Sequence, residues 1–343
     1  MAAWAGRGGL ALAALSATTC VALHDEGKPA NTRSRSFPLV VVRDVPLPGA
    51  ANRFDYQEVD ADERRLYVAH MSDDALVVLN LDDGAVLKVL PHLRTPRGIA
   101  LGANAGRLFV TTAPSQLVII DRKTLTELAR VTTGKSPDGV AYDAQDRIVG
   151  VSDQADGALS LLADAGSGAR RQVPLGSETG NVVFDAVRGS FWITVVANGA
   201  PDRLVRVAAI SGAVTSTLDL PGCRGAHGLR LHPDGQSAFV ACESNSVVLR
   251  VALAGAPTIT QASVGQGPDV MSIDPGLSWL YVAAESGTLV VFDLDRLGLV
   301  AVDREHVGER AHSVAVDPLS HRVFFPLQVG PNAGPVLRIA RPR

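Results

Sequence analysis

Short apolar runs alternate with turn-forming residues along most of this chain, and the runs recur at a nearly constant interval. Each run holds about five residues, many of them aromatic or β-branched, as in Arg65–Ala69 and Arg107–Thr111. The aligned central positions are spaced by 42, 40, 43, 47, 42 and 43 residues and are Tyr67, Phe109, Val149, Trp192, Phe239, Tyr281 and Phe324. Runs this short, bounded by turn signals, favour strands over helices. A period of this length is typical of a four-stranded repeat.

Each repeat has the same internal order. A small apolar strand such as Ser313–Val316 is followed by a tight turn such as Asp274–Gly276 and then by the recurring run. A strand rich in Val and Leu (Leu289–Phe292) and a more polar fourth strand (Glu127–Val131) complete the unit. Seven such units predict an all-β fold, a seven-bladed β-propeller whose blades are four-stranded antiparallel sheets.

The two ends of the repeat region complement each other. The seventh repeat supplies three strands and stops after Val336–Ala340, whereas Phe37–Arg43 precedes the first repeat and belongs to no complete unit. We therefore expect the N-terminal strand to pair with the last blade and close the ring. Closure removes the exposed strand edges that favour aggregation. The propeller is predicted to span residues 37–343.

The first 22 residues differ from the rest of the chain. Residues 1–22 hold one charge, Arg7, and the apolar run Leu10–Leu15, which is shorter than the roughly 20 residues that span a bilayer. The segment predicts a secretory signal peptide, followed by a flexible linker at residues 23–36. The protein is then periplasmic or secreted. The alternative is a lipoprotein anchored through Cys20. Ala17 argues against it, because Leu is usual three residues before such a cysteine.

The composition of the chain limits the kinds of binding partner that we expect. The chain has 343 residues, 46% of them hydrophobic and 20% charged, with a formal net charge of −3. It has no run of Lys or Arg, so we expect no binding to nucleic acid. No later segment is long and apolar enough to predict a transmembrane helix, and we expect a monomer.

Two of the recurring runs carry a family resemblance. Leu66–Ala69 and Leu280–Ala283 both read Leu-Tyr-Val-Ala, which resembles the YVTN repeat. The region from about residue 37 to 343 resembles the YncE-like branch of bacterial propellers, also through Arg53–Tyr56, Ser136–Gly139 and Ala311–Pro318. The resemblance implies an extracytoplasmic seven-bladed propeller and implies little about activity, since a fold does not determine function.

Polar residues recur where the first strand of a repeat starts and where its second strand ends. These two positions lie on the same face of an antiparallel blade, so their side chains are predicted to form one rim around the channel. The starts of the first strands carry Asp55, Arg97, Asp138, Asn181, His227, Asp269 and His312, and the ends of the second strands carry His70, Asp153, Glu243 and Glu285. The opposite face is expected to carry only ordinary turn residues. Polar groups at a channel mouth predict a ligand site.

The rim residues suit several kinds of chemistry. His227, His312, Glu243 and Glu285 form a candidate site for a divalent metal ion, the one cofactor that these residues suggest. The pair His227 and Glu243 is a candidate acid–base couple, and Arg97 a candidate holder of an anionic group. The competing interpretation is structural, because a polar residue repeated in every blade is also what hydrogen bonding within each blade would produce.

Cys223 and Cys242 are both expected on this rim, beside His227 and Glu243. In an exported protein we expect them to form a disulfide. Two free buried thiols are the alternative.

Two functions follow from these observations. The first is a binding module that uses the rim to hold a small molecule, a glycan or a protein partner. The second is a metal-dependent enzyme, similar to a lactonase or a lyase, with its site on the same rim. No cofactor-specific residues support a quinone-dependent oxidoreductase, and the sequence has no HExxH, GxSxG, CxxC or phosphate-loop motif.

Overall fold

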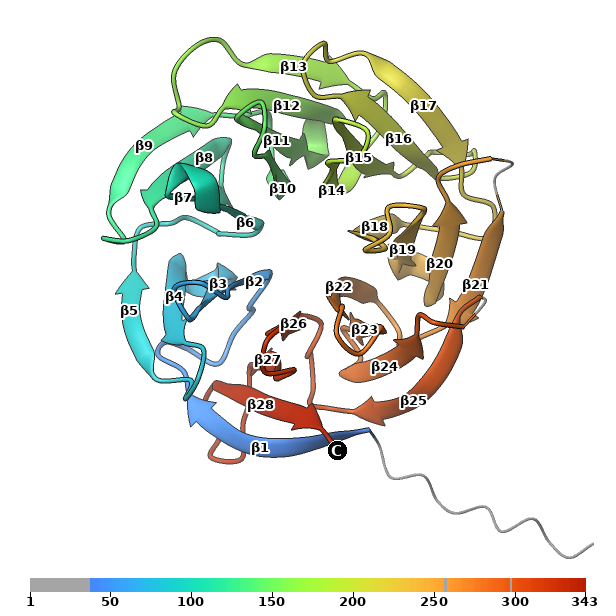
Figure 1. Cartoon of the computed structure of the whole chain (residues 1–343). Helices are drawn as coiled ribbons and strands as arrows, with labels where there is room; N and C mark the ends of the chain where they lie inside the picture. The colour runs from blue at the N-terminus through green and yellow to red at the C-terminus, as the bar shows by residue number, and fades with distance from the viewer. Residues whose placement is uncertain (1–37, 256–257, 297) are drawn as a thin grey trace, which may run out of the picture. The chain divides into compact units, whose positions relative to one another are not determined.

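Seven four-stranded antiparallel sheets surround a central axis in the part of the chain that the structure describes, as Figure 1 shows. The structure is a computed structural model that describes residues 38–255, 258–296 and 298–343. Each blade runs from an innermost first strand to an outermost fourth strand, so the predicted seven-bladed propeller is confirmed. The expected signal peptide, the linker and Cys20 lie outside the described residues.

The strands follow the predicted order in every blade. The first strands are β2 (Gln57–Asp60), β6 (Ile99–Gly102), β10 (Pro137–Asp143), β14 (Thr179–Asp185), β18 (Ala226–Leu231), β22 (Pro268–Asp274) and β26 (Ala315–Val316). The second strands are β3 (Arg65–His70), β7 (Arg107–Thr112), β11 (Ile148–Asp153), β15 (Ser190–Val195), β19 (Ser237–Cys242), β23 (Trp279–Ala284) and β27 (Val323–Leu327). The third strands are β4 (Ala75–Asn80), β8 (Gln116–Asp121), β12 (Ala158–Ala163), β16 (Arg203–Ala208), β20 (Val247–Ala252), β24 (Thr288–Asp293) and β28 (Val336–Pro342). The outer strands are β5 (Val86–Leu90), β9 (Glu127–Thr132), β13 (Arg171–Pro174), β17 (Val214–Asp219), β21 (Ile259–Ser263), β25 (Val300–His306) and β1 (Leu39–Pro46).

The described residues include four short 3₁₀ turns, which are η1 (Met71–Asp73), η2 (Ala103–Ala105), η3 (Gln154–Asp156) and η4 (Glu243–Asn245). Three of them follow a second strand, and η2 follows a first strand. No helix in residues 38–255, 258–296 and 298–343 has the length and hydropathy of a membrane span.

The N-terminal strand closes the ring, as the sequence predicted. β1 is the outer strand of the seventh blade and pairs antiparallel with β28, from Leu39 opposite Pro342 to Pro46 opposite Val336. It extends three residues beyond the predicted end at Arg43, because β28 continues to offer pairing partners as far as Val336. Arg338 on β28 donates two hydrogen bonds to the Asp44 carboxylate, at 2.9 and 2.7 Å.

The hydrophobic core lies between blades rather than inside one of them. Successive side chains of a second strand point to opposite faces of the sheet. In blade one, Leu66 and Val68 therefore pack against blade seven, whereas Tyr67 and Ala69 pack against blade two. The apolar clusters of the described residues repeat this arrangement at all seven junctions. This two-sided packing explains why the recurring runs are almost continuously hydrophobic.

Candidate functional site

The starts of the first strands meet around the channel because the blades approach one another closely there. The backbone N–H of Gly98 donates to the carbonyl of Asp138 at 3.1 Å, and that of Val270 to the carbonyl of His312 at 3.2 Å. A β-carbon added to Gly228 would overlap the carbonyl oxygen of Asp269 in the next blade. Backbone contacts between blades thus fix the spacing of the residues that carry the candidate site.

Seven ionisable side chains from five blades gather at this end of the channel. We call this set the channel mouth: Asp55, Asp138, His227, Glu243, Asp269, Glu285 and His312. All seven were predicted from the sequence as rim residues. Only Glu243 and Glu285 are substantially exposed, with 42% and 37% of their side-chain surface accessible. The other five side chains are largely buried, so most of the charged atoms lie below the surface of this end of the channel.

His227 lies between three carboxylates. Its Nε2 is 3.0 Å from Asp138 Oδ2, and its Nδ1 is 3.1 Å from Asp269 Oδ1 and 3.3 Å from Glu243 Oε1. Burial alone would lower the pKa of His227, but the charges and hydrogen bonds of Asp138 and Asp269 outweigh it and raise the pKa well above its usual value.

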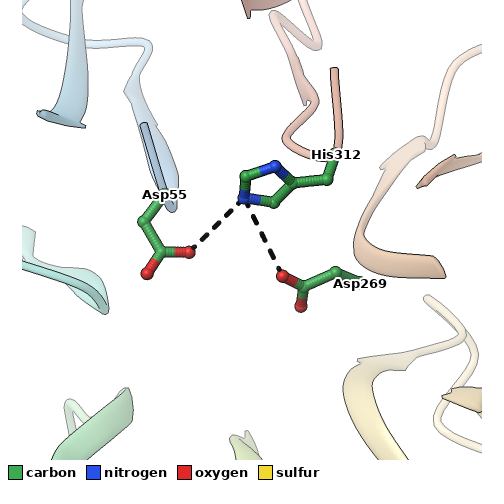
Figure 2. A group of neighbouring side chains, drawn as sticks. All are labelled: Asp55, Asp269 and His312. Atoms are coloured by element: carbon green, nitrogen blue, oxygen red, sulfur yellow. Dashed lines mark ion pairs between the residues drawn. The ribbon is translucent and has the colours of Figure 1, made fainter. Parts of the chain in front are cut away.

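The two ring nitrogens of His312 have different environments. Its Nδ1 lies 3.2 Å from the carbonyl oxygen of Arg310 and 3.6 Å from Glu285 Oε2. Its Nε2 points between two carboxylates, 3.9 Å from Asp55 Oδ1 and 4.0 Å from Asp269 Oδ2, as Figure 2 shows. Burial would lower the pKa of His312, but the interaction with Asp55 and the charge of Asp269 raise it overall.

The pKa values of the carboxylates in the channel mouth are shifted in opposite directions. Burial would raise the pKa of Asp269, but the hydrogen bond from His227 and the neighbouring positive charges lower it to about 2. Burial, together with the charges of Asp269 and Asp138, raises the pKa of Asp55. The same three causes raise the pKa of Glu243 to about 7, with His227 opposing them. Such divergent values in one recess are typical of functional sites.

Two residues of the site were missed by the sequence analysis. Arg53 donates to Glu285 at 2.6 Å and lies 4.0 Å from Asp269. The buried Tyr56 hydroxyl has no hydrogen-bond partner, and burial and the nearby aspartates raise the pKa of that hydroxyl well above its usual value. Both residues flank Asp55, at positions −2 and +1, so their nearness to a predicted rim residue was the available signal.

Four predicted rim residues lie outside the channel mouth. His70 stacks on Phe54 at 4.1 Å and hydrogen-bonds to Asn52, and Asp153 accepts from Ser160 and the Gly134 N–H within its own blade. These two fit the structural interpretation. The remaining two are Asn181, which accepts from the N–H of Val182, and Arg97, which reaches Gln154 at 2.8 Å and Asp138 at 3.7 Å at the edge of the mouth.

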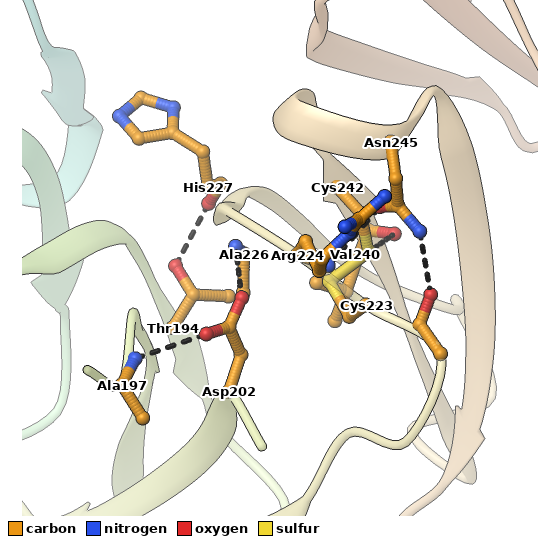
Figure 3. The surroundings of a disulfide bond; sticks show 11 residues. Thr194, Ala197, Asp202, Cys223, Arg224, Ala226, His227, Val240, Cys242 and Asn245 are labelled. Carbon is orange, nitrogen blue, oxygen red and sulfur yellow. Dashed lines mark hydrogen bonds between the residues drawn. A yellow bond between two sulfur atoms is a disulfide. The ribbon is translucent and has the colours of Figure 1, made fainter. Parts of the chain in front are cut away.

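The expected disulfide is present between Cys223 and Cys242, which are 19 residues apart. It joins the loop before β18 to the end of β19 (Figure 3). His227 lies four residues after Cys223, and Glu243 directly follows Cys242. Blade four adds support, because Asp202 accepts from the N–H of Ala226 at 2.8 Å and Thr194 donates to the carbonyl of His227 at 2.8 Å. The disulfide therefore anchors the part of blade five that carries the site.

Replacing both cysteines by serine is expected to lower the free energy of unfolding by up to about 3 kcal/mol, because the unfolded chain regains the freedom of a loop of this length. For a propeller of this size that loss corresponds to a fall in Tm of about 5 °C. Thermal unfolding with and without reductant measures it, with the double variant as the control that reductant leaves unchanged. Two free thiols in the unfolded, non-reduced propeller would contradict the bond.

The opposite face of the propeller is not the row of ordinary turns that the sequence suggested. An aspartate ends the first strand in several blades, accepts hydrogen bonds from the turn that follows and often pairs with a neighbouring blade. Asp60 pairs with Arg122, Asp274 with His321, and Asp317 with Arg64. These positions are separated by 40 or more residues in the sequence, so a single repeat could not reveal them.

The first strands also line a cavity of about 670 Å³ in the channel, beyond the mouth. Its walls are mostly apolar and include Ile99, Val140, Val182, Ile273 and Val314. Its charged wall residues are Glu58 and Arg230. Burial raises the pKa of Glu58 to about 7, with Arg230 opposing.

Comparison with known proteins supports the fold. No protein-family model matches the sequence, and no curated protein sequence matches it. Solved structures do match. A chain of Kuenenia stuttgartiensis hydrazine synthase superposes with a TM-score of 0.71 at 15% identity, covering 82% of this chain and 94% of that one. Virginiamycin B lyase from Staphylococcus aureus gives 0.69 at 12% identity, covering 88% and 99%, and a chain of the mitotic checkpoint complex gives 0.74 at 12% identity, covering 95% and 99%. At these identities the likeness establishes the β-propeller fold alone.

Proposed function

We propose that this protein is a ligand-binding module, of the YVTN or YncE-like kind, that holds a small positively charged ligand in the channel mouth. The observation that carries the proposal is the excess of acidic groups in a recess. Five carboxylates meet there; Arg53 pairs with one of them, Glu285, and Arg97 donates to Gln154 at the edge of the mouth. Protonation of the two histidines offsets part of this charge in the absence of a ligand.

Burying so many charged groups costs stability unless each is well paired. His312 Nε2 and the Tyr56 hydroxyl are buried and have no hydrogen-bond partner. Retaining unpaired polar atoms in the recess is better explained by a ligand than by a role in holding the blades together. Protein partners are less suitable, because most of the charged atoms lie too deep for a protein surface to contact.

The disulfide also supports an oxidising compartment, and we propose that the protein acts in the periplasm or outside the cell.

Thermal shift measurements with small cations test the proposal. The probes are diamines, guanidinium compounds, quaternary ammonium compounds and divalent metal ions. At least one probe is expected to raise the Tm of the wild-type protein and to leave that of an Asp138→Asn, Glu243→Gln double variant unchanged. Glu305→Gln on the outer strand β25 removes a charge far from the channel and is expected to respond like wild type. Absence of a shift with every probe would rule the proposal out.

A metal-dependent enzyme of the lactonase or lyase kind is the second candidate. The 3.3 Å approach of Glu243 to His227 favours it, since the two groups then form a partly exposed acid–base pair. We expect such an enzyme to turn over members of a lactone panel. Glu243→Gln should abolish turnover without lowering the Tm, and lack of turnover by the wild type would count against this candidate.

A further inference from the structure

His312 is held in one tautomer by its own loop. Its Nδ1 lies 3.2 Å from the carbonyl oxygen of Arg310, and a carbonyl only accepts hydrogen bonds, so Nδ1 carries a hydrogen. In the neutral ring, Nε2 then presents a lone pair. Histidine ligands of metals are commonly oriented in this way, by a hydrogen bond from the other ring nitrogen to a backbone carbonyl.

The Nε2 lone pair faces two more acceptors. Asp55 Oδ1 and Asp269 Oδ2 lie 3.9 and 4.0 Å away, too far for hydrogen bonds, and the three ligand atoms all lie within 4.8 Å of one another. The side chains of His312, Asp55 and Asp269 are 1%, 6% and 4% exposed, and Nε2 has no hydrogen-bond partner. Three buried acceptor atoms that face one another repel unless a positive charge lies among them, which is either a proton on Nε2 or a metal ion that replaces it.

A divalent metal ion matches this arrangement. Metal–ligand bonds of about 2.1 Å place neighbouring ligand atoms roughly 3.0–3.4 Å apart, so the side chains would need to move inward by less than about 1 Å. One imidazole with two carboxylates suits Zn²⁺ or Mn²⁺ better than Ca²⁺, which prefers an all-oxygen set. We propose that Asp55, Asp269 and His312 form a mononuclear site for a first-row divalent cation such as Zn²⁺ or Mn²⁺.

The neighbouring residues have distinct roles around this site. His227 contacts the other oxygen of Asp269, Oδ1, at 3.1 Å and orients the carboxylate. Glu285 holds Arg53 at 2.6 Å. His227, Glu243 and Glu285, which the sequence suggested as metal ligands beside His312, are thus not in the proposed set. Three protein ligands leave coordination positions for water or a bound molecule.

This inference deepens the proposed binding function, on which it rests, and titration calorimetry with the full chain tests it. Metal-free protein is expected to bind one equivalent of Zn²⁺ or Mn²⁺ and to bind Ca²⁺ at least 10-fold more weakly. Asp55→Asn, which keeps the shape of the side chain, and His312→Ala should each weaken binding by at least 100-fold. Glu305→Gln is the charge-matched control. His227→Gln should keep the stoichiometry and lose about 10-fold in affinity, as expected for a residue that orients a ligand.

The outcomes separate the two proposals. Absence of saturable Zn²⁺ or Mn²⁺ binding, with Tm shifts by organic cations intact, would overturn the metal site and leave the binding function standing. If neither metal ions nor organic cations shift the Tm, both the metal site and the binding function are overturned. Metal binding that survives in both Asp55→Asn and His312→Ala would place the ion elsewhere, and complete loss in His227→Gln would assign it to the group formed by His227, Glu243 and Asp269. Either of these two results would overturn the proposed ligand set.

Discussion

A chain that begins at Leu47, and so lacks β1, is expected to lose more than about 10 °C in Tm or to fail to fold. Removing β1 takes away the whole ladder with β28 and both hydrogen bonds between Asp44 and Arg338. It also removes Leu39 from the cluster between blades six and seven. The loss of several kcal/mol is large against the roughly 5–15 kcal/mol that keeps a domain folded. The exposed edge of β28 should also promote aggregation.

Thermal unfolding followed by circular dichroism measures this effect. A synthetic peptide of residues 38–47 is expected to restore part of the lost Tm by adding the missing strand. Val41→Thr and Val42→Thr are suitable controls, because these side chains on β1 are 52% and 43% exposed and should change stability by less than about 0.5 kcal/mol. A truncated chain with an unchanged Tm would show that β1 does not close the ring.

Asp317→Ala is expected to lower the free energy of unfolding by about 2–3 kcal/mol, because Arg64 and the turn that follows lose a buried acceptor of several hydrogen bonds. The Asp317 side chain is 0% exposed and accepts from Arg64 of blade one at 2.8 and 3.2 Å and from Ser320 at 2.6 Å. The variant therefore breaks the link between the last and first blades. Asp82→Asn removes the exposed second partner of Arg64 and should cost less than about 1 kcal/mol.

The contribution of Asp317 should also depend on pH. Burial alone would raise the pKa of Asp317, but the hydrogen bonds from Arg64, Ser320 and the Leu319 N–H, with the charge of Arg64, lower it overall. The ionised form is thus stabilised in the folded protein. Its contribution is complete above the unfolded pKa of about 3.9 and is lost as the pH falls through the lower folded value. The Tm difference between wild type and Asp317→Asn should be constant from pH 5 to 7 and shrink below about pH 4. A difference that stays constant down to pH 2 would contradict this pairing.

The candidate site was predictable in outline because the repeat supplied a register. Aligning the recurring runs placed Asp55, Asp138, His227, Asp269 and His312 at one end of the channel, where the structure also has them. The same alignment could not separate Glu243 and Glu285, at the ends of second strands, from His70 and Asp153, which occupy the equivalent positions but bond to residues outside the channel mouth. Equivalent backbone positions do not fix side-chain rotamers, and the neighbouring residues decide which direction each side chain takes.

Arg53 and the ion pairs of the opposite face show a second reason why the sequence could not predict every contact. Arg53 lies 232 residues from Glu285, and Arg64 lies 253 residues from Asp317, yet both pairs are in direct contact. The contact of Arg64 forms because the ring brings the first blade beside the seventh, and the contact of Arg53 forms because side chains of blades one and six meet at the channel mouth. A period in the sequence describes what every blade shares, whereas these contacts depend on how particular blades differ.

The sequence by itself determined the seven repeats, the order of strands within each blade and the closing role of the N-terminal strand, because strand periodicity and turn residues are local properties. It also predicted a rim of eleven polar residues, of which seven gather at one end of the channel. Only the tertiary structure decided that the Nε2 of His312 faces Asp55 and Asp269 while its Nδ1 is held by its own loop. The physical reason is that a site of this kind depends on distances of a few ångströms between blades, and those distances are set by backbone contacts such as the close approach of Gly228 to Asp269.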